Sequence, residues 1–275
     1  MTQTVLITGC SAGGIGSALA LEFHKKGLHV FATARSLSKM SHLQSLPNIT
    51  ILELDVTNQP SINAAVETVR KQTDGKLDIL VNNAGQSIVY PALDTNLQDA
   101  KGLFDVNFFA AIAITQAFAP LVVPSKGAIV NICSINGVMP VPWFSVYNAS
   151  KAALASWSET LRLELQPFGV RVVSLITGSV VTNILSQGDV TLPGDSLYHK
   201  ARDEISRRAS GGDRPKNSMQ PEEFARAVVG DVLGGKAGAV WRGPLAGTVK
   251  VVTALTPGWV VDNILKNGVG FDKLP

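Results

Sequence analysis

The chain has 275 residues, of which 45% are hydrophobic and 16% are charged. This balance is typical of a globular protein that buries a full core, and it argues against disorder. The formal net charge of +3 is small and spread along the sequence, so no nucleic-acid partner is predicted.

Two features of the sequence bear on where the protein is located, the N-terminus and the cysteines. A strand-like run at residues 4–7 stands where a signal sequence would carry its apolar core, which predicts a cytoplasmic protein. Cys10 and Cys133 are too few for a disulfide framework. Each is expected at a strand end with another strand between them, which is too far for a bridge, so both are predicted to be free thiols.

Short β-branched runs alternate with helical stretches. Strands are predicted at residues 5–7, 29–33, 49–54, 79–81, 128–132 and 170–176, and helices at 14–26, 62–71, 100–118 and 146–165. The strands lack an alternation of apolar and polar residues, as expected when helices cover both faces of a parallel sheet. The pattern predicts an α/β fold with a Rossmann-type doubly wound parallel sheet. The apolar run at 108–123 contains polar residues and is interpreted as a buried helix.

Residues 1–243 are predicted to form one domain, with no interdomain linker. Within it, the polar, Gly-rich segment at about 186–217 is interpreted as a mobile lid, followed by a helix at 221–233 and a short strand at 239–242. The tail, residues 244–275, is rich in apolar side chains that must be covered, so it is predicted to pack on the domain. These side chains are Val249, Val251, Val252, Leu255, Trp259, Val260, Val261, Ile264 and Leu265.

The loop at residues 8–16 reads Thr-Gly-Cys-Ser-Ala-Gly-Gly-Ile-Gly between the first strand and the first helix. Glycines allow a tight turn there and bring backbone N–H groups close to a pyrophosphate, which the helix N-terminus stabilises. Gly-rich turns without a ligand are common, but the position between strand and helix favours phosphate binding. The predicted contacts are Gly9, Ser11, Gly14, Ile15 and Gly16, with Gly13 as an alternative to Gly14.

The second strand ends in Ala34 and Arg35. Where an NAD enzyme places a carboxylate against the ribose 2′-hydroxyl, this chain places a guanidinium that can pair with a 2′-phosphate. The cofactor is therefore predicted to be NADP(H). An ordinary exposed arginine is the alternative, and Lys39 is interpreted as a solvated lysine rather than a second phosphate ligand.

Three residues suggest acid–base chemistry. Tyr147 and Lys151 lie one turn apart on a predicted helix, where an ammonium can lower the pKa of a phenol toward the range useful for proton transfer. Ser134 follows a strand at the sheet edge where such folds bind ligands, and its hydroxyl can bind a carbonyl oxygen. Taken separately, a surface Tyr–Lys pair and a capping serine are the commoner interpretations.

In this order, these motifs resemble the short-chain dehydrogenase/reductase family over residues 5–243. The resemblance implies that Tyr147 donates a proton, Ser134 polarises the carbonyl, and Lys151 holds the nicotinamide ribose, with Asn107 in the proton relay. It also implies further cofactor contacts, at Asp55, Val56, Asn82, Asn83, Gly85, Gly178, Val180 and Thr182. Thr177 replaces the family's usual proline, which frees an N–H and is expected to loosen that loop.

The loop at 8–16, the end of the second strand and the long tail are similar to a fungal branch of the family. That branch includes 1-acyldihydroxyacetone-phosphate reductases and reductases of secondary metabolism. The predicted function is NADPH-dependent reduction of a hydrophobic ketone, or oxidation of the matching alcohol, and no metal is predicted. An NADP(H)-binding regulator and a redox-neutral cyclase or isomerase on the same fold are the alternatives.

The substrate pocket is expected to be apolar, with Met139, Val141, Trp143 and Leu192 near it, although such residues are often simple packing. Lid cations could meet a substrate phosphate, but a solvated helix face is favoured for Lys200, Arg202, Arg207 and Arg208.

A homodimer is predicted, because the apolar run at 108–112 is too rich for an exposed helix and the tail obstructs a second contact surface. In the alternative, residues 259–265 lie on an endoplasmic-reticulum or lipid-droplet surface, with Lys250, Lys266 and Lys273 facing the head groups.

Overall fold

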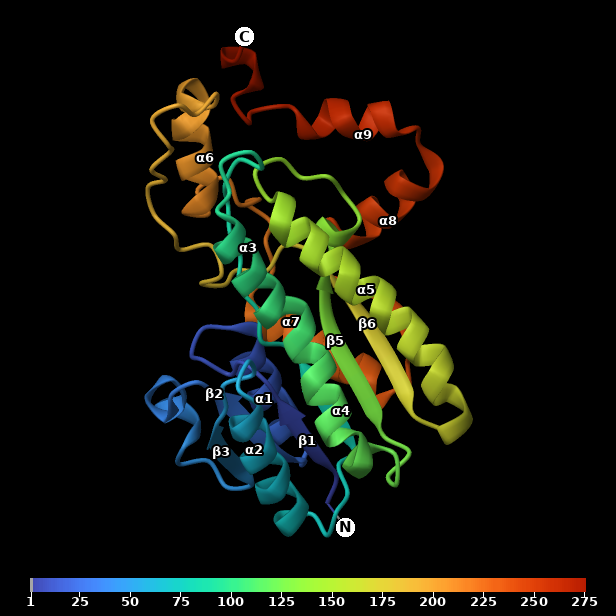
Figure 1. The fold of residues 1–275 in the computed structure, drawn as a ribbon. Helices are drawn as coiled ribbons and strands as arrows, with labels where there is room; N and C mark the ends of the chain where they lie inside the picture. Colours follow the sequence, from blue (N-terminus) through green and yellow to red (C-terminus); the bar gives the residue numbers. More distant parts are fainter. Residues whose placement is uncertain (1) are drawn as a thin grey trace.

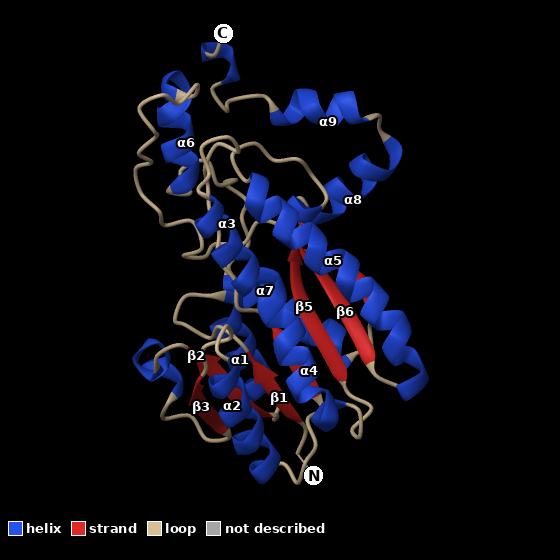
Figure 2. Ribbon diagram, viewed as in Figure 1, coloured by secondary structure: helices blue, strands red, loops and turns tan. Residues whose placement is uncertain are grey.

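A computed structural model describes residues 2–275 as a layer of parallel strands between two layers of helices (Figures 1 and 2). The seven strands follow the order β3-β2-β1-β4-β5-β6-β7, and every neighbouring pair is parallel. They are β1 (Thr4–Ile7), β2 (His29–Ala34), β3 (Ile49–Glu53), β4 (Ile79–Asn82), β5 (Ala128–Ser134), β6 (Arg171–Thr177) and β7 (Gly238–Arg242). The predicted fold class is confirmed.

Alternate residues of each strand enter two separate cores, because successive side chains in a strand point to opposite faces. On one face, Val5 and Ile7 pack with α1 (Ile15–Lys25) and α7 (Pro221–Leu233). On the other face, Leu6 packs with α2 (Gln59–Gln72) and α4 (Ala110–Val122), and the end of α5 (Ser145–Leu165) joins this core. Both faces of the central strands are buried, which is why these strands are mostly apolar on both sides.

α3 (Leu97–Phe104), the π-helical turn η2 (Asp105–Phe109) and α4 form one continuous helix. Among residues 2–275, this is the one helix long and apolar enough to cross a membrane. Its inner side, with Ile114, Phe118 and Leu121, is instead part of the core on the α2 face of the sheet. Cys10, which follows β1, and Cys133, in β5, are both buried free thiols, and β4 lies between their two strands.

Short 3₁₀ turns complete the connections. These are η1 (Leu37–Leu43), η3 (Ile135–Gly137), η4 (Gln166–Phe168), η5 (His199–Ala201) and η6 (Phe271–Lys273).

The lid contains η5 and α6 (Arg202–Ala209) and is anchored rather than free. Val190, Leu192 and Ile205 are buried in an apolar cluster of their own. Arg202 and Arg207 are exposed, as the predicted solvated helix face requires, and three lid cations also bind backbone carbonyls: Arg202 donates to Val190, Arg207 to Gly268 and Arg208 to Pro142, at 2.9–3.1 Å. Of that set, only Lys200 is exposed without such a bond in the described chain.

The tail forms α8 (Ala246–Leu255) and α9 (Gly258–Leu265) before returning to the lid (Figure 1). Val249 and Val261 are buried. The expectation that the whole apolar set would be covered is wrong, since Val251, Leu255, Trp259 and Ile264 are exposed. The two helices lie at the top of Figure 1, above β5 and β6, and among the helices and strands they contact mainly β7 and each other.

Candidate active site

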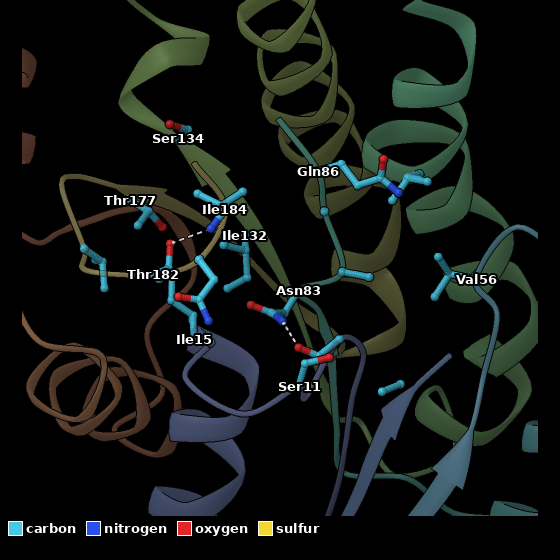
Figure 3. Close-up of a pocket in the computed structure, with 18 of the residues that line it drawn as sticks. Ser11, Ile15, Val56, Asn83, Gln86, Ile132, Ser134, Thr177, Thr182 and Ile184 are labelled. Carbon is cyan, nitrogen blue, oxygen red and sulfur yellow. Dashed lines mark hydrogen bonds between the residues drawn. The ribbon is translucent and has the colours of Figure 1, made fainter. Parts of the chain in front are cut away.

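A cavity of about 400 Å³ lies where the parallel strands end (Figure 3). Its walls come from the loops after β1, β2, β3, β4 and β6, together with the end of β5 and the first turns of α5. In parallel sheets the loops at this edge leave a crevice for ligands, so the position agrees with the prediction from the strand pattern.

The loop after β1 forms one wall through Gly9, Ser11, Gly14 and Ile15. Gly9 has a φ of +76°, and a Cβ there would stand 2.9 Å from the Cα of Ala84, so only glycine fits. Gly16 does not line the cavity. A Cβ at Gly16 would lie 2.4 Å from the carbonyl oxygen of Gly9, which shows that this glycine lets α1 pack against the loop rather than touching a ligand.

Gly14 lines the cavity and Gly13 does not, so the geometry favours Gly14 as the contact to the phosphate. Gly14 is also the N-cap of α1, where no side chain caps the helix and no acidic residue stands in the first turn. The free N–H groups and the positive end of the helix dipole therefore face the cavity without competition. This arrangement fits a pyrophosphate.

Arg35 and Lys39 lie together at the end of the cavity beside β2. Both side chains are exposed, and the backbone oxygen of Lys39 accepts a hydrogen bond of 3.0 Å from the Ala12 N–H in the loop after β1. Lys39 thus belongs to the wall, and its exposed side chain agrees with the interpretation as a solvated lysine. Two cations at this place suit a 2′-phosphate better than one.

Asp55 and Val56 line the same end of the cavity, after β3. The Asp55 carboxylate accepts hydrogen bonds from the hydroxyl and the N–H of Thr57, at 2.7 and 2.9 Å. These two bonds, with a smaller effect from Arg35, lower the pKa of Asp55. The carboxylate is therefore charged and held toward the loop, as a contact to an adenine ring requires.

The two asparagines after β4 have different places. Asn83 lines the cavity, and its amide donates to the Thr8 carbonyl at 2.7 Å, which ties the loop after β4 to the loop after β1. Asn82 is buried behind the wall and donates to Thr115 and Asn131, at 3.0 and 2.8 Å. Asn82 does not line the cavity, so its contact with the cofactor stays a prediction. Gly85 lines the cavity as predicted.

Ser134, Tyr147 and Lys151 all line the cavity (Ser134 is labelled in Figure 3). The end of β5 supplies Ser134, and the first two turns of α5 supply Tyr147 and Lys151. Lys151 is buried, and its ammonium donates to the Ile132 carbonyl at 2.9 Å, 5.9 Å from the centre of the Tyr147 ring. The end of β5 and the start of α5 thus bring Ser134, Tyr147 and Lys151 to the same part of the cavity, as the predicted chemistry requires.

The pKa of Tyr147 is raised to about 12 by burial, with partial relief from the Ser134 hydroxyl. Burial also lowers the pKa of Lys151. The net shift of the Tyr147 pKa is upward, opposite to the predicted lowering, because the cost of burying a phenolate dominates and the Lys151 ammonium is bound to the Ile132 carbonyl. Tyr147 is consequently a protonated phenol at neutral pH, which is the form that donates a proton.

Asn107 lies in the π-helical turn behind the cavity wall and does not line the cavity itself. Its amide donates to the Gln86 carbonyl at 2.9 Å and to the Ser150 hydroxyl at 3.0 Å, and its oxygen accepts from the Gln86 N–H at 2.8 Å. In this structure Asn107 links the helix that precedes α4, the loop after β4 and α5. A place in a proton relay stays a prediction.

Gly178, Val180 and Thr182 line the cavity after β6, as predicted. A Cβ at Gly178 would stand 2.0 Å from the Pro244 carbonyl oxygen, so the loop passes directly under the start of the tail. Thr177 is buried within β6 and paired with both Ser134 and Arg242. The expected loosening at Thr177 is therefore not observed, because the residue extends the strand instead.

Sequence reasoning missed several walls of the cavity. They are Ala12, Leu54, Thr57, Ala84, Gln86, Val106, Ile132, Cys133, Asn183 and Ile184. Most of them are sequence neighbours of a predicted site residue, so closeness to a motif in the sequence could have indicated that they line the cavity. The expected pocket residues Met139, Val141, Trp143 and Leu192 do not line this cavity and pack in apolar clusters instead.

Comparison with known proteins gives the same family. The short chain dehydrogenase model matches residues 3–190. A short-chain dehydrogenase of Penicillium crustosum is 47% identical over 255 residues, 93% of each chain. An NADPH-dependent 1-acyldihydroxyacetone phosphate reductase of Schizosaccharomyces pombe is 42% identical, covering 84% of this chain and 78% of that one. A short chain dehydrogenase of Burkholderia cenocepacia, solved with NADP, has a TM-score of 0.78 at 25% identity over 96% of this chain and 98% of that one.

This chain belongs to the short-chain dehydrogenase family. Within that family it is an oxidoreductase that depends on NADP(H), so the predictions of family, enzyme class and cofactor are confirmed.

Replacement of Arg35 by alanine tests the assignment of the 2′-phosphate end. We expect the Kd for NADPH to rise about 10- to 150-fold, because a charge-assisted hydrogen bond contributes about 1.5–3 kcal/mol. The Kd for NADH should change little, and Lys39→Ala should show the same selectivity to a smaller extent. Titration by intrinsic fluorescence measures both constants. Lys26→Ala, at the opposite end of β2, is the control, and equal losses for the two cofactors would contradict the assignment.

The raised pKa of the half-buried Tyr147 predicts a dependence of stability on alkaline pH. An unfolded tyrosine titrates near about 10, so the unfolded state gives up this proton before the folded state does, whose pKa is about 12. The contribution is fully present below pH ~10 and is lost as the pH rises toward ~12. Urea unfolding between pH 8 and 11, values chosen around that window, should show Tyr147→Phe gaining stability relative to the wild type above pH ~10. A constant difference would show that Tyr147 is not buried.

Proposed function

We propose that this enzyme uses NADPH to reduce an uncharged, hydrophobic ketone to a secondary alcohol, or catalyses the reverse oxidation. The observation that carries the proposal is a single cavity with Ser134, Tyr147 and Lys151 at one end and Arg35 and Lys39 at the other. The length of the cavity thus separates a cationic end for the cofactor phosphate from an end equipped for proton transfer.

NADPH supplies a hydride to the carbonyl carbon when it is bound. The chain supplies the rest of the chemistry at the carbonyl oxygen. The Ser134 hydroxyl binds that oxygen, and the Tyr147 phenol donates the proton that converts the developing alkoxide into an alcohol. Lys151 is placed to bind the nicotinamide ribose and to stabilise the phenolate that Tyr147 becomes.

The charge of the cavity supports an uncharged substrate. Of the cations that line it within residues 2–275, Arg35 and Lys39 lie at the β2 end, and Lys151 is engaged with Ile132. An acyl-dihydroxyacetone phosphate, the substrate named for the Schizosaccharomyces relative, would bring a phosphate to an end where no cation stands free. Ile184, Val180 and Ile132 give the walls an apolar character instead. We therefore favour a ketone of secondary metabolism.

A panel of ketones with acyl-dihydroxyacetone phosphate as the comparison tests this choice. NADPH oxidation with hydrophobic polyketide or terpenoid ketones is the expected result. Faster turnover of the phosphate ester would contradict it. NADPH binding with no oxidation by any member of the panel would favour a regulator, and conversion without consumption of NADPH would favour a cyclase or isomerase.

The Tyr147→Phe variant tests the proton donor. Turnover should fall to below a few per cent of the wild-type rate while the Kd for NADPH is kept, because the ring and its packing survive and the transferable proton does not. Tyr198→Phe is the matched control, since Tyr198 does not line the cavity, and it should keep its activity. A Tyr147→Phe variant with substantial turnover would remove the proposed role.

We also propose that the enzyme is a homodimer joined through the outer faces of α4 and α5, which cover the same face of the sheet (Figure 1). Phe109, Leu163 and Phe168 are each more than half exposed on or beside these helices. A subunit interface would cover them. Light scattering should report a dimer, and Phe109→Asp should shift it to a monomer, whereas Leu37→Asp, an exposed apolar site elsewhere, should not.

A stable tetramer would contradict the dimer. The exposed Leu255 and Trp259 on the tail favour the alternative contact with a lipid surface. Flotation of the full chain with liposomes tests that alternative. We expect the protein to remain unbound, whereas flotation that is lost in Trp259→Ala would support contact of the tail with lipid.

A further inference from the structure

Trp143 has a backbone conformation that a bulky residue rarely adopts. Its φ is +70°, in the left-handed region, although the residue is neither glycine nor asparagine and its side chain is buried. Such a conformation persists only when the surroundings hold it. One restraint is the hydrogen bond from the Tyr90 N–H to the Trp143 carbonyl, at 2.7 Å, which ties the residue to the loop after β4.

The second restraint on Trp143 is the end of the chain. The indole N–H donates to the Val269 carbonyl at 3.1 Å, and this bond is buried. The ring of Phe271 meets the indole edge to face at 5.2 Å, and the ring of Tyr198 from the lid does so at 5.4 Å. The indole is therefore enclosed between the lid and the tail.

The segment at 268–273 is itself fixed to the lid. Arg207 donates to the Gly268 carbonyl at 2.9 Å, and the Lys273 ammonium pairs with Glu204 at 2.5 Å. Gly270 has a φ of +85°, and a Cβ there would lie 2.8 Å from the Cβ of Ala201, so the chain passes very close to η5. These contacts hold Val269 and Phe271 in place against the indole of Trp143.

Trp143 stands directly before the helix that carries the proton donor. Phe144 is the N-cap residue of α5, and its carbonyl accepts from the Asn148 N–H at 2.7 Å. The Phe144 ring contacts the Tyr147 ring, with centres 5.9 Å apart. The conformation at Trp143 therefore sets where Phe144 lies and how the first turn of α5 presents Tyr147.

We infer that Trp143 is a positioning residue for Tyr147, and that the carboxy-terminal segment at 268–273 holds it in the conformation that the reaction requires. The inference rests on the proposed role of Tyr147 as proton donor. None of the residues that line the cavity belongs to the tail, so this segment acts on the proton-donating end without touching the cofactor site.

Variants of the full chain test the inference. Phe271→Ala should lower kcat about 10- to 100-fold, the loss that a small misplacement of a reacting group can cause, while the Kd for NADPH stays at the wild-type value. Phe271→Tyr keeps the ring and should restore kcat. Trp143→Phe keeps an aromatic ring but removes the indole N–H, and it should lower kcat in the same way. Trp259→Ala, an exposed tryptophan of the same tail, is the matched control and should be unchanged.

A structural measurement separates this inference from the proposed function. The chain has three tyrosines, so selective ¹³C labelling gives few signals, and the Tyr147→Phe spectrum identifies that of Tyr147. The signal should shift in Phe271→Ala and Trp143→Phe and stay in place in Trp259→Ala. An unmoved Tyr147 signal would overturn the inference, as would a parallel loss of kcat and NADPH affinity. Should the wild-type chain reduce none of the ketones, the proposed function fails, and the spectra still decide the positioning.

Discussion

The structure depends on the parallel alignment of the strands, which brings all of their carboxyl ends to one edge of the sheet. Backbone groups and side chains that follow β1, β2, β3, β4, β5 and β6 meet there although they lie far apart in the sequence. The free N–H groups of α1 face the same edge, and no side chain competes for them. One edge therefore holds an anion-binding end and a proton-transfer end within a single cavity.

Burial sets the chemistry of the proton-transfer end. A phenol placed in an apolar wall keeps its proton, and the nearby ammonium of Lys151 is held by a backbone carbonyl rather than by the phenol. A phenol that is protonated at neutral pH suits the proton-donating role proposed for Tyr147. The same burial makes the phenolate costly, so the ammonium has a use once the proton has left.

The lid and tail add a second level of organisation above the sheet edge. Their apolar cluster encloses Trp143, and the cations of α6 bind carbonyls of the loops around it. The lid and the tail thus contact Trp143 and Phe144, the residues immediately before α5. Under the proposed positioning of Tyr147, a part of the chain that carries none of the motifs supports the proton donor.

Local patterns were sufficient for the strands, for the helices that cover the sheet and for most of the cavity wall, because β-branched runs, the glycines at 9 and 14, and the spacing of Tyr147 and Lys151 act over short distances. They also indicated the family and its cofactor. They did not predict the bounds of α6, α8 and α9. Tertiary structure alone decided that Asn82 and Gly16 lie behind the wall, that Lys39 joins Arg35, and that the pKa of Tyr147 is raised. It also decided that the tail reaches Trp143. Each of these depends on burial or on contacts between distant segments, and neither can be read from residue order.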